Sequence, residues 1–186
     1  MVALLDRDDS VLVVVDAQPG FLAAEADSAV ERMAWLVAVA RRLGVPIVAT
    51  EEEPERNGPT DPRVAVHLPT GTPVLRKPSF GLAATPEILE ALRATGRTTA
   101  IVVGCETDVC VAQSAIGLRD EGFTCVVVED ATFSPGEMHE RGLTRVAGEG
   151  VARNHTKGVT YEWLRTVEDA HVVLHDPTLP PPPFRL

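Results

Sequence analysis

Short apolar runs alternate with stretches of helical periodicity along most of the chain. Four runs are largely apolar, at residues 11–15, 45–49, 99–103 and 123–128, and two weaker ones lie at 73–75 and 151–154. A continuous apolar run of this length is typical of a strand that is buried on both faces of a sheet. The pattern therefore predicts six strands with little exposed sheet surface.

Helix start and stop signals lie between these runs. The predicted starts are Ser28 with Glu31, Thr85 with Pro86 and Glu87, Thr107, and Ser134 with Pro135 and Glu137; the predicted ends are Gly44, Gly96 and Gly122. Two of the starts have Ser and Glu at the spacing of a capping box, in which the two side chains bind free backbone N–H groups of the first turn. A last helix is predicted to include residues 161–167.

Strands that alternate with helices within 186 residues predict a single α/β domain. We expect a three-layer Rossmann-like fold, with a parallel sheet of about six strands and helices on both faces, because parallel strands need crossover connections. Residues 1–170 are expected to form this domain. Residues 171–186 are expected to form a proline-rich tail that is extended and solvated or lies across a neighbouring subunit.

Charge and cysteine content limit which partners and which cellular compartment are expected for the protein. Acidic side chains number 27 and basic ones 17, a net charge of -10, so nucleic acid is not an expected partner. No apolar run reaches the roughly 18 residues that cross a bilayer, and the chain begins without a basic segment, so neither a membrane span nor a secretory signal is predicted. Three cysteines, an odd number, do not suggest a disulfide framework. We expect a cytoplasmic protein with reduced thiols.

Three residues that can take part in catalysis follow three different predicted strands. Asp16 follows the first run, Lys77 follows the weak run at 73–75, and Cys110 lies in the turn after 99–103. Parallel strands place their carboxyl ends at one edge of the sheet, where ligands bind, so these side chains would converge. A base, a cation and a nucleophile in one cleft are the pattern of covalent catalysis. Each residue alone also has a plainer interpretation, as a turn cap, a surface lysine and a small core residue respectively.

The position of Cys110 suggests an activated thiol. If Thr107 caps the following helix, Cys110 is its third residue, and the helix dipole and free N–H groups favour the thiolate. Lys77 would favour the thiolate too, whereas an ionised Asp16 would oppose it. We expect the pKa of Cys110 to fall from about 8.5 to roughly 6–7, the lowest of the three thiols. The other two cysteines, Cys105 and Cys125, are expected to be structural.

Motifs at these residues resemble those of the isochorismatase-like cysteine hydrolases. The segment with Asp16 matches a D-x-Q-x-x-F pattern, that with Lys77 a K-x-x-[FY] pattern, and that with Cys110 a G-x-x-T-x-x-C-V turn. Later segments also match: a G-[FY]-x-V strand ending in D-A at residues 122–131, His139 with residues 143–150, and Y-E-x-L at 161–164. The resemblance extends to about residue 170. It is closer to the isochorismatase-domain branch than to the nicotinamidases.

The resemblance implies a catalytic triad of Asp16, Lys77 and Cys110, in which Cys110 is the nucleophile and Asp16 the proton shuttle. It also implies the strand order 3-2-1-4-5-6 and a cis peptide bond between Cys105 and Glu106. The backbone N–H groups of Glu106 and Cys110 would form the oxyanion hole. The expected lining of the substrate pocket is Gln18, Phe21, Phe80 and Cys105.

No metal or other cofactor is expected. Nicotinamidases carry a metal motif of the D-x-H type after the second strand, and here that segment reads Thr50-Glu51-Glu52-Glu53-Pro54, without histidine. Its glutamates could bind a cation, but we interpret them as a solvated acidic loop. A metal at Cys105 and Cys110 would need further ligands.

Three functions are compatible with these residues. The favoured one is hydrolysis of a small amide or of a ureido or carbamoyl compound through a covalent thioester on Cys110. The first alternative is hydrolysis of a vinyl ether of the isochorismate type, in which Asp16 would protonate carbon and Cys110 would matter much less. The second is a non-catalytic binding scaffold of the same fold. The expected partners are a small-molecule substrate and further copies of the chain, as a dimer or tetramer, but neither nucleic acid nor membrane.

Overall fold

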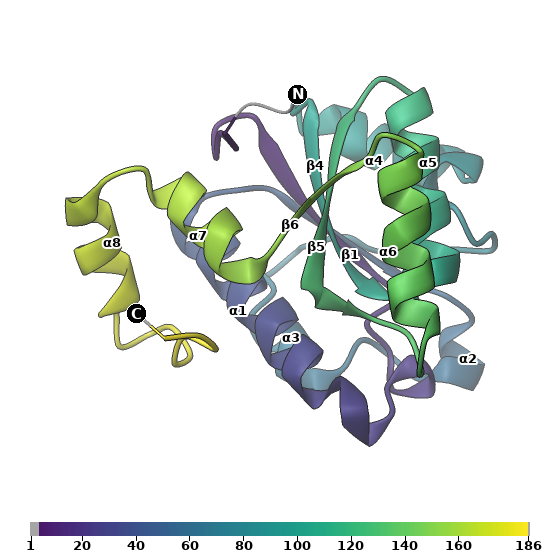
Figure 1. Ribbon diagram of the computed structural model, residues 1–186, viewed down its shortest axis with the longest axis horizontal. Coiled ribbons are helices and arrows are strands. Elements are labelled where there is room, and N and C mark those ends of the chain that lie inside the picture. Colours follow the sequence, from purple (N-terminus) through teal and green to yellow (C-terminus); the bar gives the residue numbers. More distant parts are fainter. Residues whose placement is uncertain (1–3, 186) are drawn as a thin grey trace.

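Six parallel strands form one sheet at the centre of the computed structural model (Figure 1). The strands are β1 (Ser10–Val15), β2 (Ile47–Glu51), β3 (Val74–Arg76), β4 (Thr99–Cys105), β5 (Thr124–Phe133) and β6 (Ala152–Asn154). Their spatial order is β3-β2-β1-β4-β5-β6, which confirms the predicted order. The structure describes residues 4–185, so the first three residues of the segment assessed for a secretory signal and the last residue of the proline-rich tail lie outside it.

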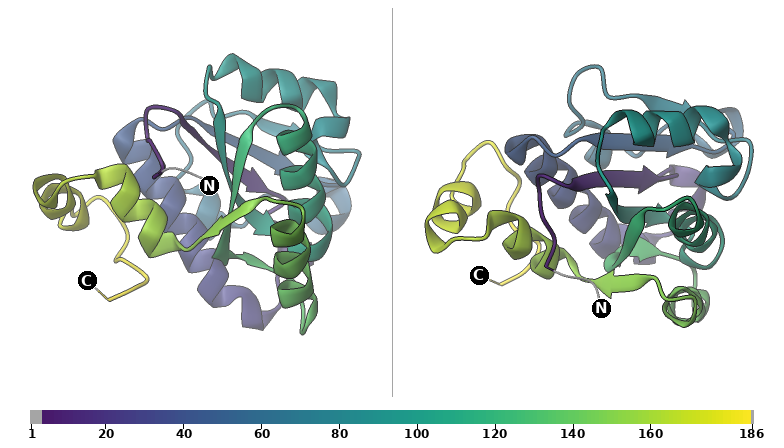
Figure 2. Two further views of the ribbon diagram at one scale, coloured as in Figure 1. Left: turned by 45° about the horizontal axis from the view of Figure 1, so that its top comes forward. Right: turned by 90° about the horizontal axis from the view of Figure 1, so that it is seen from above.

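Helices cover both faces of the sheet, as expected for a three-layer α/β fold (Figure 2). They are α1 (Asp27–Leu43), α2 (Pro54–Asn57), α3 (Pro62–Ala65), α4 (Pro86–Ala94), α5 (Ala112–Asp120), α6 (Met138–Gly148), α7 (Thr156–Leu164) and α8 (Val167–Leu174). Helices α1 and α7 pack on one face, and α4, α5 and α6 pack on the other. Helix α8 lies outside these layers against α7.

The central strand shows why a continuous apolar run is needed here. Side chains of a strand alternate between faces, so Leu12 and Val14 join the core beneath α1. Val11, Val13 and Val15 join the core beneath α4, α5 and α6. All five are completely buried. The apolar run that predicted a doubly covered strand is therefore explained by two separate cores, one on each face.

Both predicted capping boxes are wrong, although the helices themselves are present. Helix α1 begins at Asp27, one residue before Ser28, and no side chain caps it. Helix α6 begins four residues after Ser134, whose hydroxyl binds Asp108 instead. Capping residues are short polar side chains, and a tertiary partner within reach competes with the local backbone for them.

The C-terminal region contains two helices where one was predicted at 161–167. Helix α7 begins earlier because the His155 side chain accepts a hydrogen bond from the Gly158 N–H at its start. Helix α8 follows after Thr166, whose hydroxyl caps it, and extends four residues into the segment expected to be a tail. Beyond α8 the chain folds back over its own core, since the Phe184 ring meets Trp35 of α1 edge to face at 5.7 Å between centroids. The start of the expected tail is therefore helical and Phe184 packs on the core, which contradicts a fully extended, solvated tail; contact with a neighbouring subunit stays a prediction.

Candidate active site

The first strand ends in an aspartate whose side chain is completely buried. Asp16 adopts a φ of +46°, in the left-handed region that is strained for most L-residues. Its Oδ1 accepts a hydrogen bond from Thr50 Oγ1 at 2.8 Å, and its Oδ2 lies 2.9 Å from Lys77 Nζ. Burial raises the pKa of Asp16 above its ordinary value, although Lys77 and Thr50 act in the opposite direction. A carboxyl group with a raised pKa is suited to accept and return a proton near neutral pH.

The ammonium group of Lys77 lies at the centre of the site, and its side chain is completely buried. Besides Asp16, its Nζ lies 3.4 Å from Glu52 Oε2 and 3.6 Å from Cys110 Sγ. It also donates a hydrogen bond to the Ser79 carbonyl at 2.7 Å. Burial alone would lower the pKa of Lys77, but the surrounding acidic groups raise it above its ordinary value, so this lysine stays charged.

Cys110 lies in a turn, residues 106–111, which connects β4 to α5 and which we call the Cys110 turn. Thr107–Val111 forms a π-helical turn with Glu106 as its N-cap residue, so Thr107 is not the cap and Cys110 is the fourth residue rather than the third. The peptide bond between Cys105 and Glu106 is cis, as the resemblance implies. The Glu106 carbonyl accepts hydrogen bonds from two N–H groups of the turn, at 3.2 and 3.0 Å.

A glycine allows β4 to deliver this turn beside β1. Gly104 has a φ of +124°, and a Cβ at this position would lie 1.9 Å from the Val15 carbonyl oxygen. Only glycine fits such a contact without a shift of the backbone. The glycine of the sequence motif therefore reflects the close approach of β4 to the strand end that carries Asp16.

Helix α6 and the segment before it hold the Cys110 turn in place. A Cβ on Gly142 would lie 2.7 Å from the backbone nitrogen of Asp108, so α6 and the turn are in direct backbone contact. Ser134 Oγ accepts a hydrogen bond from the Asp108 N–H at 3.3 Å and donates one to Asp108 Oδ1 at 2.6 Å. Thr107 Oγ1 and His139 Nδ1 share another at 2.9 Å. These contacts position the backbone that carries Cys110.

The Cys110 thiol is almost closed off from solvent in the single chain, with 3% of the residue exposed. Burial raises its pKa to about 12, the carboxylates of Asp16 and Glu52 raise it too, and Lys77 alone opposes them. The prediction of a lowered pKa is therefore wrong: desolvation and two anions outweigh one ammonium group. Burial raises the pKa of Cys125 to about 12 as well, so Cys110 is no more acidic than Cys125.

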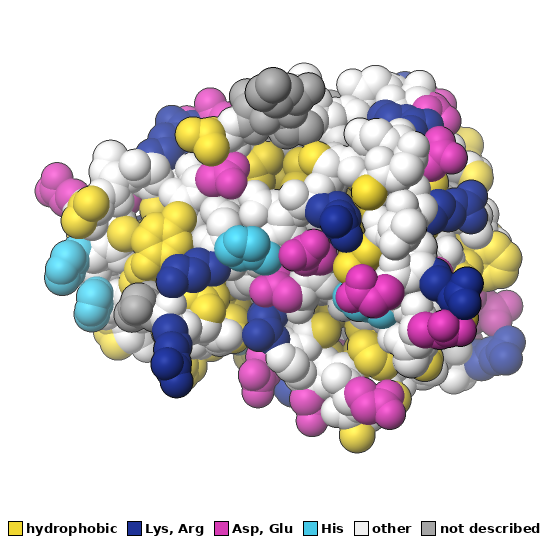
Figure 3. All heavy atoms as spheres, in the orientation of Figure 1, with side chains coloured by type: hydrophobic (Ala, Val, Ile, Leu, Met, Phe, Trp, Pro, Cys, Tyr) yellow, Lys and Arg dark blue, Asp and Glu magenta, His cyan; other side chains and the backbone are white. Residues whose placement is uncertain are grey.

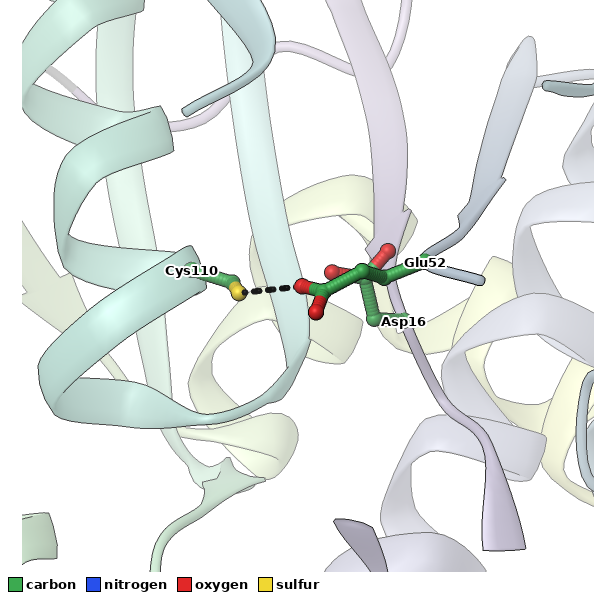
Figure 4. Close-up of side chains that lie close together, drawn as sticks. All are labelled: Asp16, Glu52 and Cys110. Atoms are coloured by element: carbon green, nitrogen blue, oxygen red, sulfur yellow. Dashed lines mark hydrogen bonds between the residues drawn. The ribbon is translucent and has the colours of Figure 1, made fainter. Parts of the chain in front are cut away.

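A second carboxylate, which the sequence interpretation assigned to a solvated loop, contacts the sulfur. Glu52 Oε2 lies 3.4 Å from Cys110 Sγ (Figure 4). Gln18 holds the loop in this position: its Oε1 accepts from the Glu52 N–H at 2.7 Å, and its Nε2 donates to the carbonyls of Glu52 at 3.0 Å and Gly58 at 2.6 Å. The position of Glu52 directly after β2, at the same edge as the other strand ends, is the signal that could have identified it.

The neighbours of Glu52 in the acidic run behave differently. Glu51 is the last residue of β2, and its Oε1 accepts hydrogen bonds from the Thr60 N–H and hydroxyl at 2.6 and 2.8 Å. Glu53 is exposed. Of the three glutamates, Glu52 is therefore the one that contacts Cys110.

The expected pocket residues differ in their burial and their contacts, and their role as a pocket lining stays a prediction. Gln18 is completely buried, and its side-chain amide is used by backbone groups, as described above. Cys105 is buried in the core on the α1 side of the sheet, whereas Cys110 belongs to the core on the other side. Phe21 is half-buried against the α1 side, and Phe80 is 54% exposed, three residues after Lys77. Asp16, Lys77 and Cys110 are brought together as predicted from their strand ends.

The donor set does not favour a metal ion. Asp16, Glu52 and Cys110 each offer a ligand atom, and these atoms lie within 4.8 Å of one another. Lys77 Nζ contacts an oxygen or sulfur of all three residues, at 2.9, 3.4 and 3.6 Å. The ammonium group already supplies the positive charge that a cation would bring to this cluster.

Among residues 4–185, none of the helices combines the length and the apolar character that a membrane crossing requires.

Comparison with known proteins identifies relatives over most of the chain. A family model described as the isochorismatase domain matches residues 10–155. The probable hydrolase YcaC of Escherichia coli (strain K12) is 31% identical over 139 residues, which cover 72% of this chain and 67% of that protein. Isochorismatase domain-containing protein 2 of Xenopus laevis is 31% identical over 165 residues, 86% of this chain and 78% of the relative. The match to the rat protein of the same name spans 64% of that protein.

Solved structures agree with these matches. The crystal structure of the E. coli YcaC gene product, described as an octameric hydrolase of unknown specificity, has a TM-score of 0.84 at 26% identity, over 91% of this chain and 86% of that one. YcaC from Pseudomonas aeruginosa, solved with hexane-2,5-diol and covalent acrylamide, has a TM-score of 0.81 at 26% identity, over 91% and 89%. The residues matched by the family model include all four side chains that meet at the sheet edge.

Proposed function

The chain belongs to the isochorismatase domain family and is a hydrolase of that family; from this premise we propose that it hydrolyses a small amide, or a ureido or carbamoyl compound, through a covalent thioester on Cys110. The observation that carries the proposal is the contact of three strand ends: Lys77 Nζ lies 2.9 Å from Asp16 Oδ2 and 3.6 Å from Cys110 Sγ. The P. aeruginosa YcaC structure, solved with covalent acrylamide, adds support for a substrate of this size, because acrylamide is a small amide.

Formation of the thioester needs a base. Since the pKa of Cys110 is raised to about 12, its sulfur carries a proton at neutral pH, and Asp16 accepts that proton as the carbon–sulfur bond forms. The carbonyl oxygen becomes an oxyanion, which the N–H groups of Glu106 and Cys110 stabilise. Lys77 holds Asp16 in place and stabilises negative charge on the sulfur. Asp16 then returns the proton to nitrogen, and ammonia or a small amine leaves.

Hydrolysis of the thioester uses the same groups in the reverse direction. Asp16, ionised again, accepts a proton from a water molecule while the water oxygen bonds to the thioester carbon. The carbon–sulfur bond breaks, the acid product leaves, and Asp16 returns the proton to the sulfur. The raised pKa of Asp16 serves both half-reactions, because the carboxyl group must accept and release a proton in each.

The proposal is tested by ammonia release from a panel of small amides, ureas and carbamoyl compounds. We expect Cys110→Ser to lower turnover of the active compound by at least about a thousandfold, as the loss of a nucleophile does. Cys125→Ser, which changes a buried cysteine within β5, is the matched control and should retain activity. Acid quenching followed by mass spectrometry should show an acyl group on Cys110.

Two other outcomes would replace the proposal. If Cys110→Ser keeps full turnover while Asp16→Asn abolishes it, the reaction depends on proton donation by Asp16 and not on a thiol nucleophile, as in vinyl ether hydrolysis. If the wild-type chain turns over no compound and carries no adduct, the binding scaffold is the better description.

The assembly and compartment of the protein are also proposed. Apolar side chains gather over α7 and α8 on one face of the chain (Figure 3), and Val167 and Val172 of α8 are 82% and 57% exposed. Because E. coli YcaC is octameric, we propose that this chain forms a homo-oligomer as well. Light scattering that finds a monomer at micromolar concentration would contradict this. The three free thiols fit a reducing compartment such as the cytoplasm.

A further inference from the structure

The four side chains of the site differ in their access to solvent. Asp16 and Lys77 are completely buried, and each satisfies the charge of the other at 2.9 Å. Glu52 also contacts Lys77, but more distantly at 3.4 Å, and 18% of its side chain is exposed. Glu52 is therefore the carboxylate that a substrate can reach from solvent. Its Oε2 also lies 3.4 Å from Cys110 Sγ.

A second carboxylate interacts with Glu52. Glu106 is half-buried and is the N-cap residue of the π-helical turn that contains Cys110. Burial raises its pKa, and repulsion by Asp108 and Glu52 raises it further, so Glu106 and Glu52 are close enough to interact. Within residues 4–185, Glu106 forms no ion pair, and Lys77 is the single basic partner of Glu52. We call Glu52 and Glu106 the acidic mouth.

The balance of charge at this mouth is negative. The positive charge of Lys77 is shared among Asp16, Glu52 and the sulfur, so one ammonium group faces two carboxylates before Glu106 is counted. A carboxylate a few ångströms from a ligand charge, in a partly desolvated cleft, changes its free energy of binding strongly. The chain as a whole is also acidic, with a net charge of -10.

We propose that the acidic mouth selects substrates that are cationic or rich in N–H donors and rejects substrates that carry a carboxylate. Glu52 accepts a hydrogen bond from an amine, amidine or guanidinium group of the substrate while the amide carbon lies over Cys110. This inference rests on the proposed function, because it assumes that the substrate binds at Cys110. It disfavours ureido acids and carboxylated vinyl ethers, and it favours small amides with a basic nitrogen.

The test uses two thiol reagents of matched size and opposite charge. These are 2-aminoethyl methanethiosulfonate, a cation, and 2-sulfonatoethyl methanethiosulfonate, an anion. In each reaction the cysteine sulfur bonds to the reagent sulfur, methanesulfinate leaves, and the thiol proton goes to solvent. The rate at Cys110 is measured by peptide mapping, and the ratio of the two rates is divided by the same ratio for 2-mercaptoethanol. A change in nucleophilicity of the sulfur affects both reagents, so the ratio reports the charge of the mouth.

We expect the normalised ratio to exceed about ten in the wild-type chain and to fall by about tenfold in Glu52→Gln, with a smaller fall in Glu106→Gln. Glu53→Gln, one residue away but exposed, is the matched control and should leave the ratio unchanged. The wild-type ratio should also decrease with added salt. Slow labelling of Cys105 and Cys125 in every variant shows that the fold is intact.

The proposal is overturned if the normalised wild-type ratio is near one, or if Glu52→Gln changes it no more than Glu53→Gln does. It is also overturned if neither reagent reaches Cys110, because the mouth would then be closed. Labelling requires no turnover, so failure here is distinct from failure of the proposed function, which the Cys110→Ser assay decides.

Discussion

The charged edge and the C-terminal corner of this protein are held together by different interactions. At the charged edge, formed by Asp16, Glu52, Lys77 and Cys110, two completely buried charges lie 2.9 Å apart. At the C-terminal corner, formed by α7, α8 and residues 175–185, the contacts are apolar rings, such as Phe184 on Trp35, and ion pairs at the surface, such as Arg42 with Asp176.

The difference explains why the two regions should respond differently to change. Buried charges are stable only while every partner remains, because an unpaired charge in a dry site is costly. Apolar contacts lose stability gradually with the area removed. The charged edge should therefore be intolerant of single substitutions, and the C-terminal corner should tolerate them with a moderate loss of stability.

The largest expected effect concerns the proton on Cys110. With the pKa of the thiol raised to about 12, its alkylation by iodoacetamide should accelerate about tenfold per pH unit from pH 8 to beyond pH 10, because the thiolate fraction increases at that rate below the pKa. A free cysteine should level off near its own value of about 8.5. If the alkylation rate of Cys110 levelled off below pH 9, the thiol would be less desolvated than the structure indicates.

The same shift has a consequence for stability. The unfolded chain releases the Cys110 proton at about pH 8.5, the value of a free cysteine, whereas the folded chain keeps it until about pH 12. The free energy of unfolding should therefore fall as the pH rises through this interval. Cys110→Ser should show a shallower fall in urea denaturation than the wild-type chain.

Removal of the central ammonium group should have the next largest effect. Lys77→Met leaves Asp16 and Glu52 without their cation and should lower the free energy of unfolding by about 3–5 kcal/mol at pH 7. Adding Asp16→Asn, a residue that also tolerates the positive φ at this position, should restore most of the loss. Urea denaturation of the single and double variants measures this. A loss below 1 kcal/mol in the single variant would mean that the two charges are not buried together.

The contact between α6 and the Cys110 turn can be tested by a substitution that adds one methyl group to α6. Gly142→Ala would place a Cβ 2.7 Å from the Asp108 backbone and should cost about 1–3 kcal/mol while slowing alkylation of Cys110. Gly148→Ala, on the same helix with no atom within 4 Å, should be neutral or stabilising by up to about 1 kcal/mol. Equal behaviour of the two variants in thermal unfolding would rule out the close contact.

The smallest effect is expected at the C-terminal corner. Phe184→Ala should lower the free energy of unfolding by about 1–2 kcal/mol, since the ring is half-buried, and should leave alkylation of Cys110 unchanged. Val172→Ala, at an exposed position of α8, should stay within about 0.5 kcal/mol of the wild-type chain. If Phe184→Ala slows the alkylation of Cys110 as much as Gly142→Ala does, the two regions are coupled.

The order of strands and the meeting of three side chains could be predicted without the structure. The strand order follows from the resemblance, and the meeting point follows from parallel topology, because all carboxyl ends lie at one edge. Asp16, Lys77 and Cys110 needed no more than their places after separate strands. The cis bond at Cys105 was implied by the family motif and is present.

The local details needed the tertiary structure, since several partners compete for one group. Ser134 has the sequence features of a helix cap, but Asp108 takes its hydroxyl. Glu52 looks like part of a solvated run, but Gln18, 34 residues earlier in the chain, holds the loop that carries it beside the sulfur. The sequence suggested that Lys77 would make Cys110 acidic, whereas burial and two carboxylates make it less so.

The framework of this protein follows from its sequence, because apolar runs predict the strands, their alternation with helices predicts the parallel sheet, and the parallel sheet predicts which residues share an edge. The state of each group at that edge follows from the folded chain, namely which groups are buried, which are paired, and in which direction their pKa values move. The reason is physical, because periodicity depends on neighbours along the chain, whereas desolvation and charge pairing depend on neighbours in space.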